Sequence, residues 1–134
     1  MADNAWSTST CRGDVMWWGV PGQGTYYWTA RFGTYWVGGG VYQRYAAAGF
    51  ECGALGPPVK PYQWLSEFGA YGQWFSGGAI YYSAGAWRVA LGNYGQTAGR
   101  LAQMDEPSPE WAETPPDAPT EPEFIPDPPT EGAP

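Results

Sequence analysis

The chain has 134 residues, 18% of them aromatic, no histidine and a formal net charge of −7 at pH 7. The missing histidine removes the commonest general base and metal ligand, and with it Ser–His and Cys–His nucleophile pairs. A chain of this length is typical of one domain that buries its own core. We therefore expect a non-enzymatic protein with no cofactor and no metal site.

The first 23 residues have neither the basic start nor the apolar stretch of a secretory signal, so we expect synthesis in a cytoplasm without export. No apolar run approaches the ~20 residues of a membrane span. The motif DVMWWGVPG within this segment is expected to cap the repeats that follow. For Cys11 and Cys52, buried free thiols are the leading interpretation; a disulfide is the alternative if the mature protein lies outside a cell.

Two later stretches share a plan: GTYYWTARFGTYWVGGG (24–40) and GAIYYSAGAWRVALG (78–92). Residues before the central turn match at a spacing of 54, and those after it match at 52, Gly33 with Gly85. This spacing predicts a loop two residues shorter in the second copy. Apolar and polar side chains alternate on both sides of each turn, which predicts two β-hairpins. Self-similarity of this kind is typical of repeated supersecondary units.

The segments around the hairpins complete the expected unit. VYQRYAAAG (41–49) favours a helix that ends at Gly49, and the Gly- and Pro-rich stretch 51–62 predicts a rigid turn. A weaker helix is predicted for 93–104. The fold class is therefore mainly β with short helices, built from about one and a half hairpin-plus-helix units. The expected domains are an N-terminal segment 1–23, a repeat module 24–104 and a tail 105–134.

The module resembles the LGFP repeat of envelope-associated proteins from mycolate-containing actinobacteria and their phages. The residues that carry the likeness are GALGPPV (53–59), GQWFSGGAIYYS (72–83) and VGGGVYQRYAAAG (37–49). Pro57 departs from the family pattern, where a phenylalanine is usual, and the first hairpin lacks the Gly-Gly pair. The resemblance implies a non-catalytic module that binds or anchors to a cell wall. Repeat arrays usually need about three copies, so the N-terminal segment or other subunits, as in a homo-oligomer, would complete this one.

The tail carries nine acidic residues, no basic ones and ten of the fourteen prolines. Prolines remove backbone donors, and the few apolar residues cannot offset the entropy of ordering, so we expect a disordered, partly polyproline-II segment. A solubilising role is favoured over a docking peptide for another protein. Trp111, Phe124 and Ile125 are its only expected anchor points.

The first 104 residues hold most of the aromatics but only six basic and four acidic residues, which argues against nucleic-acid binding. Trp and Tyr rings with few charges around them suit sugar rings, glycolipids and protein partners. The candidates are Trp17, Trp18, Tyr27, Trp36, Trp64, Trp74, Tyr81, Tyr82 and Trp87. One face of each hairpin must be core. The residues predicted to point inward are Tyr26, Trp28, Ile80, Tyr82, Trp87 and Val89, and those predicted to lie on the opposite face are Tyr27, Trp36, Tyr81 and Arg88. The preferred ligand-binding residues are Tyr27, Trp36, Tyr81, Arg88 and Trp74.

The sequence thus predicts a module that binds an actinobacterial cell-wall glycan or glycolipid, without catalysis. A surface component of an actinobacteriophage virion, on the tail or capsid, is the favoured setting, because a virion reaches the outside without secretion; the host cell envelope is the alternative. Other virion proteins are expected partners. The rival function is a purely structural virion or assembly protein, whose aromatics pack against neighbouring subunits.

Overall fold

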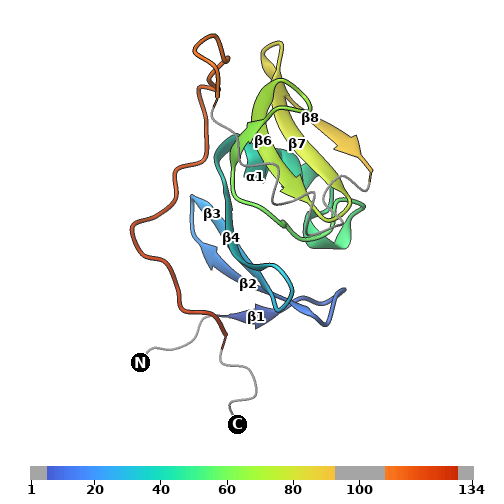
Figure 1. Ribbon diagram of the computed structural model, residues 1–134. Coiled ribbons are helices and arrows are strands. Elements are labelled where there is room, and N and C mark those ends of the chain that lie inside the picture. The colour runs from blue at the N-terminus through green and yellow to red at the C-terminus, as the bar shows by residue number, and fades with distance from the viewer. Residues whose placement is uncertain (1–5, 93–107, 130–134) are drawn as a thin grey trace.

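A computed structural model describes residues 6–92 and 108–129 and shows two antiparallel four-stranded sheets with one short helix (Figure 1). The mainly β fold predicted from the sequence is confirmed. The predicted helix 93–104 lies outside the described residues. The elements are β1 (Ser7–Thr8), β2 (Val15–Val20), β3 (Gly24–Thr29), β4 (Gly33–Gly38), α1 (Gly39–Ala47), a 3-10 turn (Phe50–Cys52), β5 (Gln63–Leu65), β6 (Ala70–Phe75), β7 (Gly78–Ser83) and β8 (Ala86–Leu91).

Each sheet is an up-and-down meander in which every strand pairs with the next one along the chain. Sheet 1 has the order β1-β2-β3-β4 and sheet 2 the order β5-β6-β7-β8. The two matched hairpins are β3–β4 and β7–β8, as the alternation predicted. The motif DVMWWGVPG does not form a separate cap, because most of it is β2, hydrogen-bonded to β3 within sheet 1. The repeated unit in the structure is therefore a four-stranded meander, which is present twice.

The two hairpin loops differ by one residue, so the predicted difference of two is wrong. Thr29 pairs with Gly33 across a three-residue loop, and Ser83 pairs with Ala86 across a two-residue loop. The shorter turn has left-handed backbone at both central positions, Ala84 (φ 53°) and Gly85 (φ 79°). Two-residue hairpin turns of this type require that geometry, so Gly85 belongs to the turn and is not the counterpart of Gly33.

Helix α1 follows β4 directly and packs against both sheets. Gly49 adopts the left-handed conformation (φ 97°) just past its end, as expected of a C-terminal stop. Its N-terminus is unusual, because the N-cap is Gly38, with no side-chain cap, and the first turn holds no acidic residue. At nine residues, α1 is the longest helix in the described part of the chain, where no helix is long and apolar enough to cross a membrane.

One core joins the two sheets. It includes Val15, Tyr27 and Val37 from sheet 1, Val41 and Tyr45 from α1, Leu55 from the loop, and Phe75 and Ile80 from sheet 2. Beside it, the fully buried Gln73 of β6 donates from Nε2 to the carbonyl oxygens of Trp36 (3.1 Å) and Lys60 (3.0 Å). A backbone carbonyl of one sheet is thereby held by a side chain of the other.

The outer faces of both sheets are also covered by aromatic side chains. On sheet 1, Trp6, Tyr26 and Trp36 form a second cluster, against which Met16, Trp18, Val20 and Trp28 pack. On sheet 2, Val59, Leu65, Trp74 and Ala79 form a third, with Phe32, Phe68 and Tyr81 against it. The predicted inward set on sheet 2 is confirmed: Ile80 and Tyr82 are buried, and Trp87 and Val89 are half-buried against the main core. On sheet 1 the prediction is wrong, because Tyr26 and Trp28 lie in the outer cluster and Tyr27 lies in the main core.

The two cysteines form a disulfide, so the leading interpretation of free thiols is wrong. Cys11, before β2, is bonded to Cys52 of the 3-10 turn, 41 residues later in the chain. Sequence spacing alone could not reveal this, because the folding of sheet 1 onto α1 brings the two loops together.

Residues 108–129, called the arm from here on, have no helix or strand, as the proline content predicted. The arm nevertheless lies along the module as a long extended segment (orange to red in Figure 1). Tyr71 of sheet 2 bonds Ser108 at one end, and Trp6, next to β1, bonds Asp127 at the other. Pro115 and Pro126 are buried. An acidic, proline-rich tail without regular secondary structure is thus confirmed, and its residues 108–129 also contact the module.

Candidate functional site

The five predicted ligand-binding residues lie in different surroundings. Tyr27, Trp36 and Trp74 are buried, with exposed fractions of 4%, 6% and 1%. Tyr81 is half-buried and its ring stacks on Phe68 at 4.4 Å between centroids. Arg88 is exposed and donates from Nε to the carbonyl oxygen of Ser83 (2.9 Å). The prediction that Tyr27 and Trp36 point away from core is wrong, because both faces of sheet 1 are covered.

The strand register explains why these residues do not form one surface. Directly paired residues on antiparallel strands share a face. Tyr81 pairs with Arg88, as the sequence suggested, but Tyr27 pairs with Tyr35, and Trp36 pairs with Tyr26. Tyr27 and Trp36 therefore project from opposite faces of sheet 1. For Trp36 the error follows from the loop: the loops differ by one residue and not by the predicted two, and a shift of one position moves each residue after the turn to the other face.

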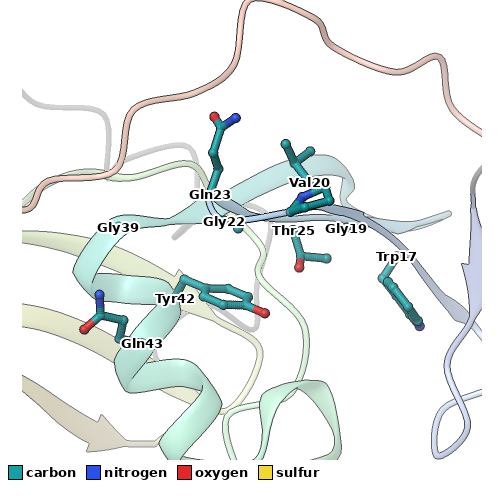
Figure 2. A pocket seen from close by; sticks show the side chains of 11 residues that line it. Trp17, Gly19, Val20, Gly22, Gln23, Thr25, Gly39, Tyr42 and Gln43 are labelled. Carbon is teal, nitrogen blue, oxygen red and sulfur yellow. The ribbon is translucent and has the colours of Figure 1, made fainter.

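The structure instead has a groove beside sheet 1, formed by two hollows of about 520 Å³ and about 330 Å³. Both hollows are lined by Trp17, Thr25 and Tyr42, so they lie side by side. Figure 2 shows the larger one: Tyr42 extends from α1 toward the space between Thr25 and Trp17. Trp17 is 38% exposed, which is high for so large an apolar side chain in the body of the fold. Two aromatic side chains, Trp17 and Tyr42, therefore lie where the two hollows meet.

The smaller hollow brings polar groups to the groove. It is lined by Tyr27 and Glu51, and the Tyr27 hydroxyl is hydrogen-bonded to the Glu51 side chain. Burial, and then the neighbouring Glu51 carboxylate, raise the pKa of Tyr27 far above its usual range, so this hydroxyl stays protonated. Arg12 holds the same turn, because its Nε donates to the backbone carbonyl of Glu51 (2.5 Å).

The wall beside Glu51 has a strained backbone. Phe50 has a φ of 56°, which is uncommon for a bulky residue. Its ring lies 5.6 Å from that of Tyr42 and 5.9 Å from that of Tyr45. The Cys11–Cys52 disulfide joins the same turn to the start of sheet 1. Ring packing and a covalent bond together fix this part of the groove, and strained positions of this kind are concentrated at functional sites.

The lining residues of the groove supply hydrogen-bond donors and acceptors. Hydroxyls of Thr25, Tyr27 and Tyr42 both donate and accept hydrogen bonds, the amides of Gln23 and Gln43 add further donors and acceptors, and Glu51 is the one carboxylate among the lining residues. Hydrolysis of a glycosidic bond ordinarily uses two carboxylates. Cys11, Glu51 and Cys52 lie close enough to share a metal ion, but the two sulfurs are bonded to each other and do not offer thiolates.

Sequence reasoning identifies part of this groove. Tyr27 is among the preferred residues, and Trp17 belongs to the wider aromatic set. Tyr42, Gln43 and Glu51 are missed, because they come from α1 and the turn after it, where the sequence pattern predicts only a helix and a rigid turn. The available signal is the alternation in VMWWGV, which places Trp17 and Trp18 on opposite faces of β2.

No protein-family model and no curated protein matches this sequence. The resemblance to the LGFP repeat thus rests on the short motifs named above.

Proposed function

We propose that this protein is a non-catalytic glycan-binding module that attaches to an actinobacterial cell envelope as a surface component of a phage virion. The observation that carries the glycan-binding part is the groove, with an exposed Trp17 facing hydroxyls and amides. Indole and phenol rings offer flat apolar faces to sugar rings, and the hydroxyls and amides match the donors and acceptors at the ring edge. A volume of about 520 Å³ is in the range of small-ligand sites.

The setting is supported by different features. The resemblance to the LGFP repeat favours the envelope of a mycolate-containing host, with a cell-wall glycan or glycolipid as the ligand. The Cys11–Cys52 disulfide favours a location outside the reducing cytoplasm. A protein on a virion surface is synthesised inside the host cell and acts outside it, which agrees with both features.

The test is a sedimentation assay with the full chain on intact and delipidated mycobacterial cell walls. The variant Trp17→Ala is expected to bind about five- to tenfold more weakly, because the loss of one ring contact costs roughly 1 kcal/mol. Trp111→Ala is the matched control: it removes another exposed tryptophan, 74% accessible, that lies on the arm and does not line the groove. Circular dichroism of each variant verifies the fold.

Binding of the native chain that falls with Trp17→Ala and not with Trp111→Ala supports the proposal. Failure of the native chain to sediment with either wall preparation contradicts it, and would favour the rival function of a structural virion or assembly protein.

A further inference from the structure

The arm is held by ring donors of the module that bond to its backbone carbonyls. Trp6 donates from Nε1 to the carbonyl oxygen of Asp127 (2.8 Å), and the Tyr26 hydroxyl donates to that of Phe124 (2.6 Å). Proline has no N–H, and a polyproline-II chain leaves its carbonyls free of internal bonds. Aromatic grooves that recognise proline-rich peptides use this chemistry.

A second attachment is at the N-terminus of α1. The backbone N–H of Gly40 donates to the carbonyl oxygen of Asp117 (2.8 Å), and Trp87 Nε1 donates to its carboxylate Oδ1 (2.9 Å). Because α1 has no side-chain cap or acidic first turn of its own, Asp117 supplies both an acceptor and a negative charge where the helix dipole favours them. The arm therefore completes an element of the module from a distant part of the chain.

The glycines at this point leave room for the arm. A Cβ on Gly39 would lie 2.5 Å from the carbonyl oxygen of Asp117, and one on Gly40 would lie 2.6 Å from its Oδ2. Gly39 also has a φ of 56°, which favours glycine. Any larger residue at either position would push against the bound arm.

Two contacts between aromatic rings also hold the arm, one near each of its ends. Phe124 lies 5.4 Å from Trp18 on the outer face of sheet 1, and Trp111 lies 5.7 Å from Trp64 on sheet 2. The contacts with rings, the α1 terminus and the two buried prolines are distributed from Trp111 to Asp127. We name the contacted surface the arm face: Trp6, Trp18, Tyr26, Gly40, Trp64 and Trp87.

From these contacts we infer that the arm face is a binding site for an acidic, proline-rich peptide, and that the arm of a second copy of this chain binds there in place of the chain's own. Every contact is non-covalent, so the arm face can bind an arm of the same sequence whether or not that arm belongs to the same chain. Residues 93–107 separate the arm from the module by fifteen residues, which span up to about 50 Å when extended. That reach allows exchange between neighbouring copies.

The experiment uses the full chain with a specific protease site inserted between Gly99 and Arg100, cut only after folding. A fluorescent synthetic peptide of residues 108–129 is then added in excess, and its anisotropy is followed as it replaces the cut arm. Since the peptide is in excess, the arm face is empty only briefly during exchange, and the assay does not require a bare module to stay folded for long. A short tether supplies an effective concentration of the order of 1 mM, so a Kd below about 1 mM is expected.

Peptide variants test the contacts without touching the module. The Asp117→Asn peptide loses the charge at the α1 terminus and should bind about three- to tenfold more weakly. The Glu113→Gln peptide undergoes the same charge change at an exposed residue and should bind like the native peptide. On the module, Tyr26→Phe should weaken binding about three- to tenfold, and Tyr42→Phe, which alters the groove, should not.

Saturable exchange with this ranking supports the inference. An absence of binding up to about 1 mM, while circular dichroism shows the cut protein still folded, would overturn it. Equal affinities for the Asp117→Asn and Glu113→Gln peptides would overturn it as well. Neither result depends on whether the groove binds a glycan.

Discussion

Among its individual residues, this protein relies on buried tyrosines whose hydroxyls are hydrogen-bonded. The Tyr45 hydroxyl donates to the carbonyl oxygen of Gly56 (2.6 Å), and its ring lies 4.6 Å from that of Phe75. The Tyr27 hydroxyl is bonded to Glu51. Such partners matter in a core with few aliphatics, because an unpaired buried hydroxyl costs about 1–3 kcal/mol.

These tyrosines predict a loss of stability in alkali. Burial, as the largest cause, raises the pKa of Tyr27, Tyr45 and Tyr62 in the folded state. Unfolded tyrosines ionise near pH 10, so above about that pH these three side chains gain charge in the unfolded state and not in the folded state, and the stability present at lower pH is lost as the pH rises. The free energy of unfolding, measured with urea, should be level from about pH 7 to 9. It should then fall by about 1–3 kcal/mol between about pH 10 and 11.

The variant Tyr45→Phe identifies the source of that loss. It removes one of the buried hydroxyls, so its free energy of unfolding should decline less steeply in alkali than that of the native chain. An identical decline in both proteins would show that Tyr45 does not contribute.

Within the elements, loops and caps decide which side chains meet. The three-residue loop of the β3–β4 hairpin sets the register that places Tyr27 and Trp36 on opposite faces of sheet 1. The terminus of α1 is completed by a distant Asp117. The turn that holds Glu51 is fixed by the disulfide to the segment before β2. Each of these three features involves only a few residues. Two of them, the contact of Asp117 with α1 and the disulfide, join residues that are far apart in the chain.

The disulfide between the turn and the start of sheet 1 leads to a stability prediction. Its two cysteines are separated by 41 residues, and closing a loop of that size stabilises a fold by about 3–4 kcal/mol through the unfolded state. The double variant Cys11→Ser/Cys52→Ser should therefore lose about 3–4 kcal/mol of free energy of unfolding in urea, and reduction of the native protein should produce the same loss.

The double variant should keep the far-ultraviolet circular dichroism of the native fold, which serves as the control. A change below about 1 kcal/mol both in the double variant and on reduction would contradict the bond.

Taken as a whole molecule, the two sheets behave as one unit because they share a core. The main cluster takes side chains from sheet 1, α1 and sheet 2, and Gln73 of β6 bonds to the carbonyl of Trp36 in β4. The arm then follows both sheets, with contacts at Trp64 on one and Trp18 on the other. Neither meander buries its apolar face without the other.

Thermal unfolding should therefore be a single transition, with calorimetric and van't Hoff enthalpies that agree. Gln73→Ala removes a fully buried side chain and leaves two carbonyls without this donor, so it should lower the free energy of unfolding by about 2–4 kcal/mol. The variant should still unfold in one step. Two separate transitions in the native protein would show that the sheets fold independently.

Local patterns in the sequence were sufficient to predict the mainly β fold, both hairpins, α1 with its stop at Gly49, and a proline-rich segment without helix or strand. These features depend on the alternation of apolar residues, on helix periodicity and on the backbone preferences of glycine and proline. All three can be recognised within a short stretch of sequence. The folded chain was needed to reveal the Cys11–Cys52 bond, the facing of Trp36, the groove around Trp17 and Tyr42, and the attachment of Asp117 to α1. Each of these depends on a strand register or on a contact between distant segments, and a local sequence pattern does not determine which distant segment will pack against it.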